Sequence, residues 1–412
     1  MAASYKAGTI TSPTSTGNLG FTGIGFQPKV LLLFFEKQTA AGNGVDYLRG
    51  HGFATSSSSE RAISAVFLDT GIGGIVNMAR AQSNANCLYA FNTTAVSASA
   101  FLVADFVSFD ADGFTLNFST VQASGYLIEY VALGGADLTN VAIKDVQSPG
   151  STGNVAYTGV GFQPDALITI TNSDTSAGPG SSHNAGARVG IGFVTAGASK
   201  ATHSVGDDNS GKKYARAQRT GVTMALDVVT PSLLFEATHV SMDSDGFTWN
   251  WNTVSANRYT FVLCLKGGQY KVGVFNQATG TGNQAVTGVG FTSLGTMLAS
   301  VNAVATTSIN TGAKHSLGAA DSSSSRFALW LGATGDPAVV DHTVDSSNVI
   351  RMLTEGTPTD VTTADYVSND ADGFTINNTT VDATSREVVY FSFGNSAVAA
   401  TNRLLMMLGV GI

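Results

Sequence analysis

The sequence predicts an all-β chain of three tandem antiparallel β-sandwich domains, jelly-roll-like and produced by an internal triplication. One phrase, Thr-Gly-x-Gly-Phe, recurs at 22–26, 158–162 and 287–291, and a second, Asp-x-Asp-Gly-Phe-Thr-x-Asn, recurs at 110–117, 243–250 and 370–377. Short apolar runs closed by Gly, Asn, Asp or Pro fill the chain between them, without sustained 3.6-residue periodicity. The repeated unit is therefore a whole domain built of strands.

The spacing of the second phrase sets the domain boundaries. Its glycines, Gly113, Gly246 and Gly373, lie 133 and 127 residues apart. We expect unit one at 1–136, unit two at 137–268, unit three at 269–394 and an apolar C-terminal tail at 395–412. The glycine-containing joints are short, so neighbouring units should touch.

Each unit should contain the same strands in the same order. An early apolar strand (30–35, 166–170, 297–301) follows the first phrase. In the strand of the second phrase, Phe114, Leu116 and Phe118 share one face because successive side chains alternate sides. Near-continuous apolar strands then close the units at 126–133, 259–265 and 388–393, which places them at the centre of a sandwich. The strand order does not follow from these patterns.

Composition limits the classes of partner. Only 12% of the 412 residues are charged, the net charge is −8, and no run of Lys or Arg occurs. These features argue against nucleic acid or an anionic membrane as partner, and the nine-residue apolar end of the chain is too short for membrane insertion. The N-terminal residues lack a secretory signal, so we expect synthesis and folding in a cytoplasm. Cys87 and Cys264 stand in non-equivalent places inside apolar runs, which favours buried free thiols.

The repeated phrases offer little chemistry. Asp-x-Asp-Gly could bind Ca²⁺ through its carboxylates, but such loops supply further acidic ligands, so a structural turn is the favoured interpretation. The Gly-x-Gly of the first phrase lacks the lysine of a phosphate-binding loop. The six histidines show no paired spacing. We therefore expect no catalytic residues, no metal and no cofactor, and hence no enzyme.

A few residues are candidates for ligand or interface contacts. Arg80, Arg216 and Arg351 recur in similar surroundings, and a half-buried guanidinium could pair with a carboxylate, for example that of the Asp-x-Asp-Gly turn, or with a ligand. Structural pairing is favoured. Trp251 aligns with Phe118 and Asn378, which places it near a rim where it could stack on a sugar.

The apolar side chains of the tail must be shielded from water. Leu404, Met406 and Leu408 could pack on their own domain or clip onto another subunit, including a second copy of the chain in a homo-oligomer.

A resemblance rests on four segments of unit one: Thr16-Gly-Asn18, Thr22-Gly-Ile-Gly-Phe-Gln-Pro28, Ser108-Phe-Asp-Ala-Asp-Gly-Phe-Thr-Leu-Asn117 and Tyr126-Leu-Ile-Glu-Tyr-Val-Ala-Leu-Gly134. Together with their copies they resemble repeated β domains of virion structural proteins from tailed bacteriophages and prophages. A fainter likeness, carried by Phe26-Gln-Pro28 and Phe162-Gln-Pro164, is to H-type lectin domains.

The resemblance implies a non-enzymatic virion protein. The expected roles are a capsid decoration or fortifying protein, or a component of a fibre, spike or tail, with capsid or tail subunits as partners. The alternative is a carbohydrate-binding adhesin or receptor-binding module that recognises a surface glycan during host attachment.

Overall fold

The computed structural model describes residues 2–45, 47–67, 78–94, 97–176, 184–207, 213–227, 232–304, 309–334, 339–354 and 358–396. All regular elements in these ranges are β-strands, and every pairing between them is antiparallel. The prediction of an all-β chain of antiparallel sandwiches is confirmed.

Within the described ranges each unit contributes eleven strands, which correspond one to one. Unit one contains β1 (Ala3–Thr11), β2 (Gly17–Thr22), β3 (Pro28–Glu36), β4 (Gly42–Val45), β5 (Tyr47–Ser56), β6 (Ser59–Phe67), β7 (Met78–Ser83), β8 (Leu88–Thr94), β9 (Ser97–Asp110), β10 (Gly113–Thr120) and β11 (Leu127–Gly135). Unit two contains β12 (Asn140–Gln147), β13 (Gly153–Thr158), β14 (Ala166–Thr171), β15 (Asn184–Ala185), β16 (Ala187–Thr195), β17 (Ala198–Asp207), β18 (Lys213–Arg219), β19 (Thr223–Asp227), β20 (Ser232–Asp243), β21 (Gly246–Thr253) and β22 (Tyr259–Lys266). Unit three contains β23 (Gln269–Asn276), β24 (Gly282–Thr287), β25 (Ser293–Ser300), β26 (Ile309–Thr311), β27 (Ala313–Ser322), β28 (Ser325–Thr334), β29 (Val339–Asp345), β30 (Ile350–Leu353), β31 (Asp360–Asp370), β32 (Gly373–Thr380) and β33 (Glu387–Gly394).

Two sheets form in each unit, a seven-stranded inner sheet and a four-stranded outer sheet. The inner sheets have the orders β1-β11-β3-β5-β6-β7-β15, β12-β22-β14-β16-β17-β18-β26 and β23-β33-β25-β27-β28-β29-β4. The outer sheets have the orders β2-β10-β9-β8, β13-β21-β20-β19 and β24-β32-β31-β30. The closing strands β11, β22 and β33 lie inside the inner sheets, as their continuous apolar runs indicate.

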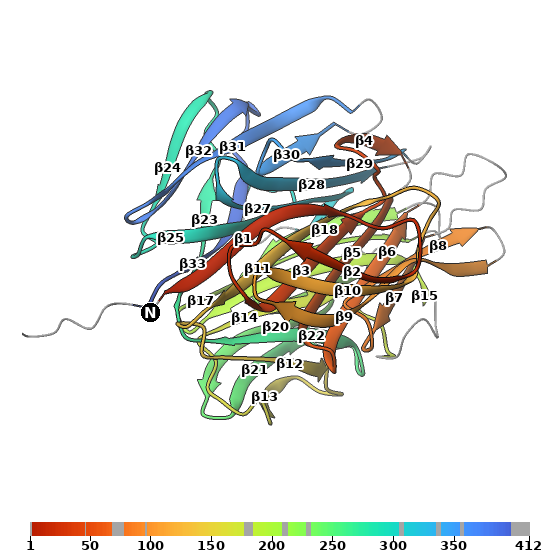
Figure 1. Ribbon diagram of the computed structural model, residues 1–412, viewed down its shortest axis with the longest axis vertical. Helices are drawn as coiled ribbons and strands as arrows, with labels where there is room; N and C mark the ends of the chain where they lie inside the picture. Colours follow the sequence, from red (N-terminus) through yellow and green to blue (C-terminus); the bar gives the residue numbers. More distant parts are fainter. Residues whose placement is uncertain are drawn as a thin grey trace, which may run out of the picture.

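The last strand of every inner sheet comes from a different unit. Unit two supplies β15 to unit one, unit three supplies β26 to unit two, and unit one supplies β4 to unit three. The exchange therefore runs in a closed cycle through all three units, which group around a common centre (Figure 1). Since each exchanged strand covers an otherwise open sheet edge, it removes an aggregation-prone template as well as tying two units together.

Apolar side chains form separate sandwich cores and one shared core. Along β3, Leu31, Leu33 and Phe35 face the sandwich of unit one. Leu32 and Phe34 alternate with them and face a cluster that includes residues of all three units. The continuous apolar runs of the inner strands thus have two cores to fill, one on each face.

The two repeated phrases meet at one point in each unit. In unit one, Gly23 N and Gly25 N donate to the two carboxylate oxygens of Asp112 at 3.1 and 2.5 Å. Both glycines have positive φ, 85° and 88°, which aims their N–H groups at the same anion. Asp110 accepts hydrogen bonds from Ser108 and Thr115. Units two and three repeat these bonds at Asp243 and Asp245 and at Asp370 and Asp372.

Replacing Asp245 and Asp372 together by Asn should lower the thermal stability at neutral pH and have a much smaller effect near pH 2. The backbone N–H groups of Gly161 and Gly159, and of Gly290 and Gly288, hold the pKa of these two carboxyls below its usual value. A lowered pKa in the folded state stabilises the fold above the ordinary carboxyl pKa of about 3.9, and the stabilisation is lost as the pH falls through the folded pKa. Calorimetric melting of the wild type and the variant at the two pH values checks this. An equal difference in melting temperature at both pH values would contradict it.

Candidate functional site

Trp251 does not lie at a rim, so the expectation of an exposed sugar platform there is wrong. Its side chain is fully buried in the sandwich core of unit two. The aligned Asn378 is also buried, and it forms hydrogen bonds with Gln277 and Gln284. A polar residue at this position therefore does not indicate that the position is exposed. The indole Nε1 of Trp251 donates to Tyr157 Oη at 2.9 Å.

Arg80 and Arg216 fasten the exchanged strands. Arg80 Nη1 donates to Gly186 O at 3.0 Å, directly after β15. Arg216 Nη1 donates to Thr311 O and, at 3.1 Å, to Gly312 O, at the end of β26. The favoured structural role fits these contacts, but the partners are backbone carbonyls of the next unit instead of the turn carboxylates.

Arg351 is not the counterpart of the other two arginines. It lies on β30, where it pairs with Asp345 at 3.1 Å and Asp360 at 2.8 Å. The position opposite the exchanged strand of unit three is occupied by His342, which pairs with Gly44 of β4. The sequence around Arg351 resembles that around Arg80 and Arg216, but Arg351 lies one strand later in its unit, on β30 instead of β29.

The structure bears on the other expectations to differing degrees. Both cysteines are free and buried, as predicted. Among the described residues no group of three or more His, Cys, Asp or Glu side chains is arranged to hold a metal ion. Leu404, Met406 and Leu408 lie outside the described residues. The tail begins with Asn395, which accepts a hydrogen bond from Ala3 N at 2.8 Å.

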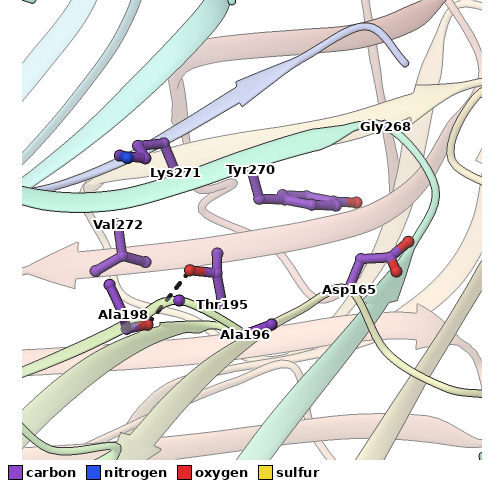
Figure 2. Close-up of a pocket in the computed structure, with 9 residues that line it drawn as sticks. Asp165, Thr195, Ala196, Ala198, Gly268, Tyr270, Lys271 and Val272 are labelled. Carbon is purple, nitrogen blue, oxygen red and sulfur yellow. Dashed lines mark hydrogen bonds between the residues drawn. The ribbon is translucent and has the colours of Figure 1, made fainter. Parts of the chain in front are cut away.

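One cleft, the seam cleft, lies where the β16–β17 hairpin of unit two meets β23 of unit three. Its volume is about 370 Å³. Figure 2 shows Tyr270 extending toward Asp165 and Val272 reaching toward Ala198, while Lys271 points away from the hairpin. Asp165 is already engaged, since it accepts bonds from Lys266 Nζ at 2.9 Å and Gly267 N at 2.7 Å. The lining residues are Asp165, Thr195, Ala196, Gly197, Ala198, Gly268, Tyr270, Lys271 and Val272.

We call the contacts between neighbouring units seams. At each of the other two seams an ion pair lies at the hairpin that corresponds to β16–β17. Arg61 of unit one binds Asp145 of unit two with N···O distances of 2.6 and 3.0 Å. Lys6 Nζ of unit one lies 3.3 Å from Asp321 Oδ2 of unit three. At the seam between units two and three, the strand register places Val274 where unit two has Asp145, and it is 36% exposed.

Val274→Asp should strengthen the seam between units two and three. The new carboxylate would face Lys200, the counterpart of Arg61, and reproduce the ion pair of the first seam. A partly exposed pair of this kind contributes about 0.5 kcal/mol. Urea unfolding at low salt checks the gain, which should disappear with Val274→Asn and shrink at high salt.

A second cleft, the edge cleft, lies where β12 and β13 of unit two run along the edge of the sandwich. Its volume is about 500 Å³, and it is lined by Lys144, Asp145, Gln147, Ala156, Tyr157, Thr158 and Tyr259. Lys144 Nζ donates to Thr158 O at 2.7 Å. Tyr157 Oη donates to Gln147 O at 3.1 Å while it accepts the indole hydrogen bond from Trp251. Burial raises the pKa of Tyr157 to about 12, so the phenol keeps its proton at neutral pH.

Polar side chains also meet inside the shared core, which the sequence analysis did not anticipate. Arg49 of unit one pairs with Glu36 and lies 2.8 Å from His315 Nδ1 of unit three, whose Nε2 lies 2.9 Å from Thr202 Oγ1 of unit two. Because a guanidinium can only donate, His315 accepts at Nδ1 and donates from Nε2. Glu129 is fully buried in the same inner sheet with Arg49 as its charged neighbour, and the ring centroid of His51 lies 6.3 Å from that of His315. We call this group the axial cluster: Glu36, Arg49, His51, Glu129, Thr202 and His315.

Burial sets the charge states of the axial cluster. It raises the pKa of Glu129 to about 8, although the charge of Arg49 acts in the opposite direction. Burial and then Arg49 lower the pKa of both His51 and His315 well below the usual value. At neutral pH these histidines are neutral and Glu129 is largely protonated. The cluster therefore joins three units by hydrogen bonds with few net charges in the core.

Comparisons with known proteins assign no family. No family model and no curated protein matches the chain. Among solved structures, β-fructofuranosidase from Schwanniomyces occidentalis in complex with fructosyl-erythritol is 9% identical, over 95% of this chain and 98% of that chain, with a TM-score of 0.14. A similarity at that level supports no conclusion about fold or activity. The described part of the chain has no helix long and apolar enough to cross a membrane.

Proposed function

We propose that the protein is a non-enzymatic structural component of a tailed-bacteriophage virion, a capsid decoration protein or a part of a fibre, spike or tail. The observation that carries the proposal is the closed exchange of β4, β15 and β26, which makes one chain into a preassembled three-part body. Such a body suits attachment at a site of threefold or pseudo-threefold symmetry. Its partners are capsid or tail subunits, and it is made in the host cytoplasm before it joins the particle.

The use of the repeated residues supports an architectural role. Asp112 and its counterparts bind backbone amides within their own unit, and Arg80 and Arg216 bind the backbone of the next unit. These side chains are thereby occupied by the fold itself. A protein whose threefold-repeated aspartates and whose arginines Arg80 and Arg216 serve its own assembly fits a scaffold better than a catalyst.

Association with particles tests the proposal. Particles from a lysate of the host that carries the gene are banded by density, and particles from a deletion strain are mixed with the purified chain. We expect the chain in the particle band and saturable rebinding to the deficient particles. A chain that stays at the top of the gradient in both experiments would refute the proposal.

A carbohydrate-binding, receptor-binding module is the second candidate. The edge cleft favours it, because it gathers two tyrosines, an amide, a carboxylate and an ammonium group in one concave place.

A further inference from the structure

Unit two differs from its neighbours at the edge where its first strand pairs with its last. In unit one Gly8 pairs with Tyr130, and in unit three Gly273 pairs with Tyr390. The tyrosine ring lies over the glycine in both, since a Cβ on Gly8 would be 2.7 Å from Tyr130 Oη and one on Gly273 would be 2.4 Å from that of Tyr390. Two of the three units therefore fill this edge with an aromatic ring.

In unit two the same pair is Lys144 and Val262. Glycine has been replaced by a long side chain, and the tyrosine by a small one, so that the ring no longer covers the edge. Lys144 lines the edge cleft, with its ammonium group held at Thr158 O. The two changes occur together in one unit, at the edge where the cleft lies.

The two tyrosines that line the cleft have no tyrosine at the corresponding positions of units one and three. Tyr157 stands at the position of Phe21 and Val286, as the pairing of β13 with β21 shows. Its hydroxyl is fixed by Trp251 and Gln147 O. Tyr259 likewise stands at the position of Leu127 and Glu387.

We propose that the edge cleft of unit two binds a saccharide of one or two pyranose rings. The phenol rings of Tyr157 and Tyr259 offer apolar faces for the C–H side of a sugar. Gln147, which is exposed, and the ammonium group of Lys144 offer hydrogen-bond partners for its hydroxyls. A volume of about 500 Å³ lies in the range of small-molecule sites. Asp145 is paired with Arg61 of unit one, so this contact between units one and two holds one wall of the cleft in place.

This inference deepens the second candidate function and is independent of the virion role. A chain that joins particles without binding sugar would refute only the saccharide proposal, and a chain that binds sugar without joining particles would refute only the virion proposal.

Saturation-transfer NMR on the full chain tests the site, with methyl β-galactopyranoside, methyl α-glucopyranoside and methyl β-glucuronide as probes. We expect transfer to at least one probe, with a millimolar Kd typical of a small open site. Preference for the glucuronide would identify Lys144 as the group that selects an acidic sugar, and equal transfer to the neutral probes would assign recognition to the tyrosines and Gln147.

Two variants copy the residues of the other units and so should keep the fold. Lys144→Gly with Val262→Tyr refills the edge as in units one and three, and Tyr259→Leu copies unit one. Each should raise the Kd at least about tenfold, whereas Thr195→Ala in the seam cleft should leave it unchanged. Absence of transfer to all three probes, or binding lost in Thr195→Ala and kept in Tyr259→Leu, would overturn the proposal, provided that melting temperatures stay near that of the wild type.

Discussion

Gly246→Ala should destabilise the protein by more than about 4 kcal/mol, or prevent folding altogether. Gly246 follows Asp-x-Asp in unit two with φ of +150°, and a Cβ at this position would lie 1.9 Å from Tyr157 O. The carbonyl belongs to the paired strand β13, so it cannot move without breaking the ladder. The same close approach, 1.8 Å from Phe21 O and 2.0 Å from Val286 O, recurs at Gly113 and Gly373.

Urea unfolding of the soluble variant, or its yield after refolding, measures the effect. Gly197→Ala is the matched control in the same unit, because a Cβ there has no atom within 4 Å and should change the stability by less than about 0.5 kcal/mol. Equal stability of the two variants would show that the turn tolerates a side chain and that the repeated glycine has another purpose.

Glu129→Gln should raise the stability at pH 8 by an amount on the order of 3 kcal/mol and at pH 5 by a much smaller amount. Burial raises the pKa of Glu129 to about 8, whereas the unfolded chain ionises near the ordinary carboxyl value. Between these two values the unfolded state releases a proton that the folded state keeps, so the wild-type stability falls as the pH rises through this range. Glutamine retains the shape without the ionisation.

The histidines of the axial cluster give the opposite slope. Because burial lowers the pKa of His51 and His315, the unfolded chain takes up protons below about pH 6.5 that the folded chain excludes, and stability falls as the pH decreases. Below about pH 6.5 the two histidines outweigh the one carboxyl, so the wild type should be most stable near pH 6.5, while Glu129→Gln should show a plateau above pH 6.5. Unfolding free energies from pH 5 to 9 decide this, and a Gln variant that follows the wild-type profile would contradict the assignment.

The fold class could be predicted because it rests on strongly patterned residues. The alternation Phe114, Leu116 and Phe118 and the two threefold phrases specify strands, turns and their repetition. The exchanged strands could not be predicted in the same way. β4, β15 and β26 span only four, two and three residues, and their Gly, Asn and Thr resemble ordinary loops. Only pairing with a distant edge strand makes them part of a sheet.

The candidate sites needed the strand register. The alignment of Trp251 with Phe118 is correct. The aligned Asn378 suggests an exposed position, but Asn378 is buried because hydrogen bonds satisfy its side chain. The edge cleft lies beside a paired change, Lys144 with Val262, on two strands that are far apart in sequence. A signal existed in the sequence, since the first and last strands of unit two depart from the glycine and tyrosine of the other units, but its meaning depends on knowing that the two positions face each other.

Cutting the chain at both joints tests the closed strand exchange most directly. A protease sequence is inserted after Ala136 and after Gly267, the uncut protein is checked for a wild-type melting temperature, and the cleaved protein is examined by native mass spectrometry. We expect the three fragments to remain together as one complex until denaturant is added, because each unit holds a strand of the next. Three fragments that separate in buffer as folded monomers would show that the units are independent domains and that the exchange of β4, β15 and β26 does not hold the molecule together.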